Sequence, residues 1–146
     1  MLKVKVEINP LYSEAHAILK YNSMTKEIED LKNILESYNN VLMGYSDDNM
    51  TLLQYNEIYR IYTENQKVFA ITSKGKYLLK MRLYEIEIML LKHQFIKVSR
   101  FEIINVMQIQ ELKNLYSGNI KIIFKYGEST FVSRRFVSQI KKKLGI

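Results

Sequence analysis

The feature that most constrains this fold is a two-residue hydrophobic period that begins near residue 41 and recurs almost to the C-terminus. Successive side chains of a β-strand point to opposite faces, so this period predicts strands that each bury one face. The predicted strands cover residues 41–46, 51–54, 57–62, 66–72, 75–82, 95–98, 106–112, 119–126 and 129–133. Turn residues separate several of them, most clearly at Tyr126-Gly127-Glu128, and indicate antiparallel hairpins.

Three segments interrupt this period and are predicted to form short helices. The clearest is residues 83–91, where leucine and isoleucine recur at helical spacing. Residues 100–105 and 134–143 fit short helices as well. The expected fold class is therefore mainly β, with antiparallel sheets and a few short helices.

The first 40 residues are predicted to form a strand-helix extension. Residues 2–8 alternate apolar and charged side chains, which predicts a half-buried strand that ends at Pro10. Residues 15–21 fit a second strand. Residues 24–38 show helical spacing, and a Ser or Thr near their start can act as the N-cap.

The predicted N-terminal helix carries an apolar stripe that has to be covered. Its members are Met24, Ile28, Leu31 and Leu35. The stripe must pack against the β-rich part of the chain or against a second copy, and both arrangements stay open. The chain is thus expected to be α+β overall, with an N-terminal strand-helix extension at residues 1–40 and a β-rich domain at residues 41–146.

Charge is distributed unevenly along this chain, whose net charge is +7. Residues 1–57 hold 5 Lys and Arg against 9 Asp and Glu, whereas residues 58–146 hold 17 against 6. An acidic front and a strongly basic back favour contact with a polyanion over a surface tuned only for solubility. No apolar run approaches the ~18 residues of a membrane span, and the start does not resemble a signal peptide. A cytoplasmic protein is therefore expected.

The sequence offers little support for an enzyme or a metal site. The chain has no cysteine, and His16 and His93 each lack a partner at metal-ligand spacing. It also lacks a GxSxG motif and a phosphate-cradling glycine-rich loop. We therefore expect no catalytic residue, no cofactor and no metal.

Two short polar breaks in the C-terminal third carry the most distinctive basic residues. Ser99-Arg100 follows one predicted strand, and Ser133-Arg134-Arg135 follows another. The planar guanidinium of arginine matches phosphate or guanine with two parallel donors, and a loop at a strand end presents such a side chain outward. This pattern indicates loops directed at a nucleic acid.

Four segments resemble, in order and spacing, the LytTR-type DNA-binding domain, the β-rich output module of many bacterial response regulators. They are ENQKVFAITSKGKY (64–77), LYEIEIML (83–90), FIKVSRFEIIN (95–105) and GNIKIIFKYGESTFVSRRFVSQIKKKL (118–144). The resemblance covers roughly residues 41–144. The preceding VKVEI and TKEIEDLKNIL resemble the extension of stand-alone members, which lack a receiver domain.

The resemblance implies antiparallel sheets that read the DNA major groove through loops and not through a recognition helix. By position, the expected base contacts are Gln66, Lys67, Arg100, Arg134 and Arg135. The expected phosphate contacts are Lys97, Ser99, Ser133, Lys141 and Lys142. This chain has RFE at residues 100–102 where response-regulator members often have RSY.

The function expected from these features is a sequence-specific transcriptional regulator that binds double-stranded promoter repeats as a homodimer. The resemblance also implies control by an inhibitory membrane protein, which is encoded beside some stand-alone members. Two alternatives stay open: a protein-interaction module that docks an acidic partner through its basic face, and an RNA or single-strand binder that stacks bases on some of the eleven tyrosines. The first alternative predicts no preference among duplexes, and the second predicts preference for unpaired substrate.

Overall fold

The computed structural model describes residues 2–13, 15–38 and 40–146, and the chain divides into two units, Met1–Asn39 and Asn40–Ile146. In the N-terminal unit, the helix α1 (Lys26–Tyr38) is the one regular element among the described residues. The Thr25 hydroxyl caps this helix by accepting a hydrogen bond from the backbone N–H of Ile28 (3.3 Å). The helix predicted over residues 24–38 is therefore confirmed.

The strands predicted at residues 2–8 and 15–21 are wrong, because these residues have no regular secondary structure. The apolar side chains of the first segment are mostly exposed: Val4 by 80%, Val6 by 76% and Ile8 by 90%. A strand is held by hydrogen bonds to a neighbouring strand, and the described part of this unit supplies no such neighbour. Alternation of side chains alone cannot replace that partner.

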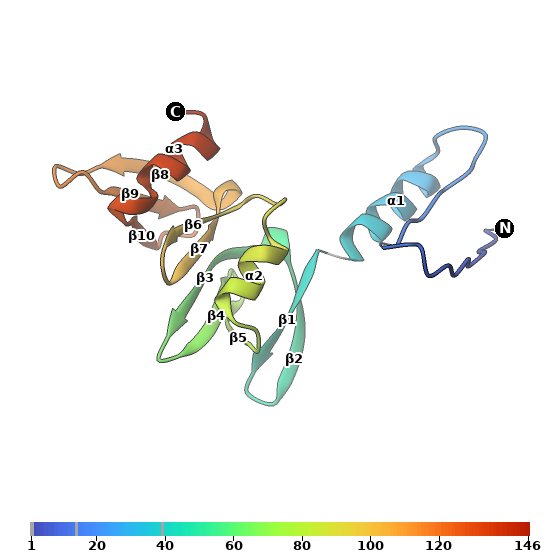
Figure 1. The fold of residues 1–146 in the computed structure, drawn as a ribbon, viewed down its shortest axis with the longest axis horizontal. Helices are drawn as coiled ribbons and strands as arrows, with labels where there is room; N and C mark the ends of the chain where they lie inside the picture. Colours follow the sequence, from blue (N-terminus) through green and yellow to red (C-terminus); the bar gives the residue numbers. More distant parts are fainter. Residues whose placement is uncertain (1, 14, 39) are drawn as a thin grey trace. The chain divides into compact units, whose positions relative to one another are not determined.

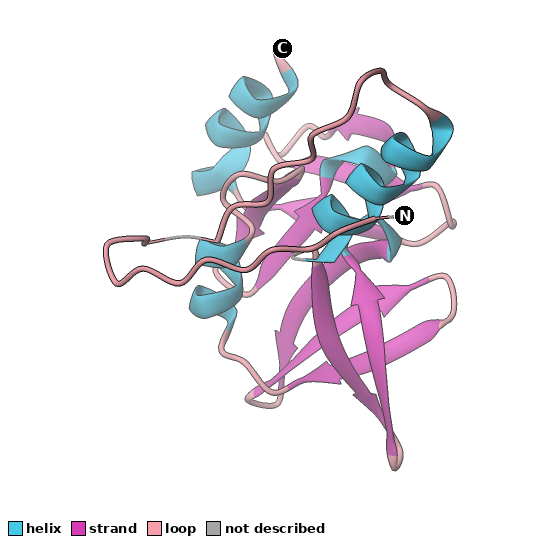
Figure 2. Ribbon diagram, turned by 90° about the vertical axis from the view of Figure 1, so that its right-hand side faces the viewer, coloured by secondary structure: helices cyan, strands magenta, loops and turns pink. Residues whose placement is uncertain are grey.

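The C-terminal unit contains two antiparallel sheets and two α-helices (Figures 1 and 2). The larger sheet has the strand order β2-β1-β5-β4-β3-β7-β6, and the smaller sheet has the order β10-β9-β8. The strands of the larger sheet are β1 (Val41–Ser46), β2 (Asn49–Gln54), β3 (Ile58–Glu64), β4 (Lys67–Thr72), β5 (Gly75–Leu79), β6 (Phe95–Ser99) and β7 (Glu102–Asn105). Those of the smaller sheet are β8 (Ile109–Asn114), β9 (Ile120–Phe124) and β10 (Ser129–Val132).

The α-helices of this unit are α2 (Leu83–Met89) and α3 (Val137–Leu144). Single turns of 3-10 helix occupy Tyr55–Glu57, Val106–Gln108 and Arg134–Phe136. Within the described ranges, no helix is both long enough and apolar enough to cross a membrane.

The predicted fold class is confirmed, with local differences in the bounds and type of some elements. The sequence predicts a helix over residues 100–105, but these residues form a turn followed by β7. The strand predicted from residue 106 begins only at Ile109. All four residues of β7 are buried, so this strand has no exposed face and no two-residue period. Residues 134–143 are helical as predicted, although their first turn is a 3-10 helix.

Strands β6 and β7 form a wall shared by two hydrophobic cores. Phe95 and Ile103 pack in a first core with residues of β1–β5 and α2. Val98 and Ile104 pack in a second core with residues of the smaller sheet and α3. Because side chains of one strand alternate between its faces, each of the two strands serves both cores. The turn that joins β6 to β7 is therefore carried by two strands that are packed on both faces.

Candidate nucleic-acid interface

Three connections that carry predicted contact residues lie side by side in the C-terminal unit. They are the β3–β4 turn (65–66), the β6–β7 turn (100–101) and the segment after β10 (133–136). The backbone N–H of Thr63, near the end of β3 and two residues before the first connection, donates to the carbonyl of Phe101 in the second (2.9 Å). The backbone N–H of Ser133 donates to the carbonyl of Val98 (2.9 Å), which joins the third to β6. We call these three connections the clustered turns.

The β3–β4 turn holds both of its central residues in the left-handed region, Asn65 at φ 50° and Gln66 at φ 64°. Positive φ at both positions is typical of a type I′ turn, for which Asn-Gly is a preferred pair. Gln66 therefore stands where glycine would be less strained, and its side chain is exposed, as is that of Lys67. A strained backbone under an exposed polar side chain points to a use for that side chain.

Replacing Gln66 by glycine should stabilise the fold by about 1 kcal/mol, because glycine enters the left-handed region without the penalty of a Cβ atom. Thermal unfolding of the full chain should show a higher Tm. Lys74→Gly is the matched control, since Lys74 also lies in a hairpin turn but does not have a positive φ. The control should not be stabilised, and an unchanged Tm for Gln66→Gly would mean that the turn stores no strain.

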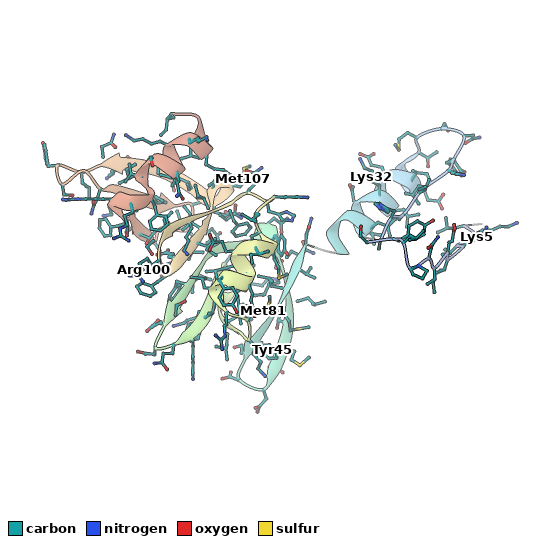
Figure 3. The ribbon with its side chains drawn as sticks, viewed as in Figure 1. Lys5, Lys32, Tyr45, Met81, Arg100 and Met107 are labelled. Carbon is teal, nitrogen blue, oxygen red and sulfur yellow. The ribbon has the colours of Figure 1, made fainter. Side chains whose placement is uncertain are left out.

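The β6–β7 turn presents Arg100 to solvent (Figure 3). The Ser99 hydroxyl accepts a hydrogen bond from the backbone N–H of Phe101 (3.2 Å), which stabilises the turn from within. Phe101 is 61% exposed. The sequence does not identify it as a candidate contact residue, because phenylalanine is usually buried in the core. An exposed aromatic ring beside a guanidinium that pairs with none of the described residues fits a surface that contacts bases.

The segment after β10 presents Arg134 and Arg135, both exposed, from a 3-10 turn. Phe136 follows them and packs on the second core. The turn leads directly into α3, whose Ile140 is fully buried. The two arginines are therefore held on a short element with an apolar anchor on its C-terminal side.

The predicted phosphate contacts differ in their availability. Lys97 lies 3.2 Å from the Glu87 carboxylate of α2 and its side chain is 26% exposed, so it already has an acidic partner. The Ser99 hydroxyl is occupied in its own turn. Ser133, Lys141 and Lys142 are exposed. These last three residues are the better placed to meet a polyanion.

The acid nearest to Arg100 along the chain, Glu102, is buried and paired elsewhere. Arg60 Nε lies 2.9 Å from Glu102 Oε2, close enough for an ion pair although the angle falls short of a hydrogen bond. The Thr130 hydroxyl donates to Glu102 Oε1 (2.7 Å). Burial raises the pKa of the Glu102 carboxyl, and the charge of Arg60 and the hydrogen bond from Thr130 oppose that rise. Arg100 thus keeps its positive charge uncompensated by this neighbour.

The structure brings Gln66, Arg100, Arg134 and Arg135 onto connections that are hydrogen-bonded neighbours or adjoin the same strand. Within the described residues, no group of three His, Cys, Asp or Glu side chains is arranged to hold a metal ion. The arrangement can therefore offer several guanidinium and amide donors to an extended, negatively charged ligand.

Comparison with known proteins identifies what this chain is similar to. Residues 48–145 match the model of the LytTr DNA-binding domain. Two uncharacterized HTH-type transcriptional regulators from strains of Staphylococcus aureus are 32% and 31% identical to the chain, each over the whole length of both proteins. The solved LytTr DNA-binding domain of a putative methyl-accepting/DNA response regulator from Bacillus cereus superposes with a TM-score of 0.70 at 22% identity, covering 73% of this chain and 98% of that one.

The helices of this chain do not form a helix-turn-helix pair in the part that the structure describes. Five strands separate α1 from α2, and five more separate α2 from α3. A helix-turn-helix motif needs two helices joined by a turn of a few residues.

Proposed function

This chain belongs to the LytTR family, a family of DNA-binding transcriptional regulators and not of enzymes, and we propose that it reads double-stranded DNA in the major groove through the clustered turns. The observation that carries this proposal is the pair of backbone hydrogen bonds, Thr63 to Phe101 and Ser133 to Val98, that hold the turns together. Loops on a rigid scaffold can enter a groove as a helix does, provided that their relative positions are fixed.

In this proposal, Arg100 and Arg135 make most of the base contacts, assisted by Gln66, Lys67 and Arg134. An arginine in the major groove can donate two parallel hydrogen bonds to guanine O6 and N7. The long side chains of Gln66 and Arg134 start from the neighbouring turns and are exposed. Sequence preference would then be distributed over three short stretches of the duplex.

Phosphate contacts are proposed for Ser133, Lys141 and Lys142, with weaker parts for Lys97 and Ser99. Contacts of this kind set the register on the duplex and supply salt-dependent affinity. Lys97 would have to exchange its ion pair with Glu87 for a phosphate, which reduces the net gain.

The experiment that tests the proposal is a selection of duplexes from a randomised library by the full chain. A duplex that is enriched and retained in excess competitor DNA supports sequence-specific reading. Retention of all duplexes alike would favour the alternative, a basic face that docks an acidic partner. Preference for the unpaired strand would favour a single-strand binder.

We also propose that the N-terminal unit makes the protein a homodimer on paired promoter repeats. A unit of this size can bury little of its own apolar surface: Met24 is 71% exposed and Ile34 is 64% exposed. Pairing two copies would cover such side chains and place two reading modules on two half-sites.

By the family resemblance, we further propose that the protein is cytoplasmic and that an inhibitory membrane protein encoded nearby controls it.

Light scattering should give the mass of a dimer for the full chain and of a monomer for a chain that starts at residue 40. The physical reason is that the truncation removes the exposed apolar side chains of the N-terminal unit. A duplex with two half-sites should bind the full chain more tightly than a duplex with one, and the truncated chain should lose that advantage. A full chain that stays monomeric at high micromolar concentration would remove the dimer from this account.

A further inference from the structure

One buried polar cluster joins the strands that carry all three clustered turns. Arg60 lies on β3, which leads into the turn of Gln66. Glu102 is the first residue of β7 and comes directly after the turn of Arg100. Thr130 lies on β10, which leads into the segment of Arg134 and Arg135. We call Arg60, Glu102 and Thr130 the junction cluster.

We infer that the junction cluster is a positioning device that sets the spacing of the clustered turns on DNA, an inference that rests on the function proposed above. Its members would not touch DNA themselves. They would act through the residues that the turns present, which makes them positioning residues for base reading.

The first argument is the geometry of the Glu102 carboxylate. Its two oxygens face partners in different sheets: Thr130 of the smaller sheet at 2.7 Å and Arg60 of the larger sheet at 2.9 Å. The hydrogen bond that the Thr130 hydroxyl donates to this carboxylate is short and directional, and the Arg60 contact adds an ion pair on the other oxygen. One carboxylate therefore fixes the smaller sheet, and the arginines that follow β10, against the strand beside the Arg100 turn.

The second argument is that stability alone does not explain a largely buried ion pair at this place, in which the side chains of Arg60 and Glu102 are 18% and 10% exposed. Glu102 and Thr130 are only 8% and 9% exposed, so their polar atoms have lost water. Replacing a buried ion pair by apolar residues of similar volume is often neutral or stabilising. The second core continues around the cluster with apolar side chains such as Ile104 and Val132. Apolar side chains could therefore fill the positions of the cluster as well. What the polar cluster adds is one defined relative position of the strands β3, β7 and β10 that carry its three residues.

The third argument concerns charge. Arg60 forms an ion pair with the carboxylate of Glu102. A second acid, Glu128, is more exposed and lies 4.0 Å from Arg60 Nη1. The Glu128 carboxylate also accepts a hydrogen bond from the Tyr126 hydroxyl (2.9 Å). Both acids are thereby kept in contacts with Arg60, Thr130 and Tyr126. Neither acid makes its described contacts with Arg100, so the Arg100 guanidinium stays available to a DNA base.

Two substitutions at one position separate positioning from stability. Thr130→Val keeps the volume and the methyl group but removes the hydroxyl that Glu102 accepts from. Thr130→Ser keeps the hydroxyl but removes a methyl group from a buried site, which lowers stability. If the cluster has a merely structural role, DNA discrimination by the two variants should follow their Tm values. If it has a positioning role, discrimination should depend on whether the hydroxyl is present.

The measurement is the ratio of affinities for two duplexes: the one that the wild-type chain selects from a randomised library, and a scrambled duplex of equal length. For Thr130→Val the ratio should fall about fivefold or more, because one well-placed bidentate contact with guanine contributes at least about that much discrimination. For Thr130→Ser the ratio should stay within about twofold of wild type. Glu102→Gln, which keeps an acceptor for Thr130 but loses the charge that faces Arg60, should also lower the ratio.

Ile122→Val is the matched control, since it removes one methyl group from a fully buried residue of the smaller sheet outside the junction cluster. It should lower the Tm and leave the ratio unchanged. Equal ratios for wild type, Thr130→Val and Thr130→Ser would overturn this inference and leave the proposed function intact. A wild-type chain that selects no duplex would overturn the proposed function, and the inference with it.

Discussion

Raising the salt concentration from about 50 mM to about 200 mM should weaken binding of the full chain to its selected duplex by roughly a thousandfold. Each phosphate that a Lys or Arg neutralises releases condensed counterions, and release becomes less favourable as salt rises. The basic half of the chain, residues 58–146, carries 17 Lys and Arg. If Lys97, Lys141 and Lys142 of both copies meet phosphates, about 6 contacts in all, log K should fall against log salt with a slope near −5.

Fluorescence anisotropy on a labelled duplex measures this slope directly. Lys142→Ala provides the internal check, because each lost phosphate contact should reduce the slope by about 1, and a bound dimer loses one contact in each copy. A slope near zero for the wild-type chain would rule out binding through phosphates. A steep slope that Lys142→Ala leaves unchanged would keep DNA binding but remove Lys142 from the interface.

Arg100→Ala should cost about 1–3 kcal/mol of affinity for the selected duplex and should relax discrimination at one position of the site. Arg100 is exposed and its neighbour Glu102 is already paired, so its guanidinium is available to form two parallel bonds to one base. Removing those bonds should penalise the correct base and leave the others almost unaffected. Competition binding with single-base variants of the duplex measures both effects.

Lys142→Ala is the control for this substitution as well, since a phosphate contact carries no sequence information. It should weaken selected and scrambled duplexes about equally. If Arg100→Ala also weakens both equally, Arg100 contacts a phosphate, and base reading has to come from Arg134, Arg135 or Gln66.

The sequence predicted the hairpins well, and its failures have identifiable physical causes. An alternating segment such as 129–133 carries its own signal, because one face is buried and the other is not. The segment 102–105 carries no such signal, because all four of its residues are buried and their pattern fits a helix as well as a strand. Residues 2–8 show the opposite failure, a clear alternation with no partner strand.

The candidate site was predictable where one residue type was enough to define it. Arg100, Arg134 and Arg135 stood out because each follows an apolar run in a polar break. The junction cluster did not, since Arg60, Glu102 and Thr130 are far apart in the sequence and only the pairing of β3 with β7 and the packing of the two sheets bring them together. The ion pair of Lys97 with Glu87 was hidden for the same reason.

The wall of β6 and β7 has a consequence for how this protein can evolve. Its buried side chains belong to both cores, whereas the residues at its tip belong to neither. Selection for a new target sequence can therefore change the tip residues freely, while the wall that supports them stays constant. A duplicated gene could drift to a different set of promoters by a few exposed substitutions, without passing through an intermediate that fails to fold.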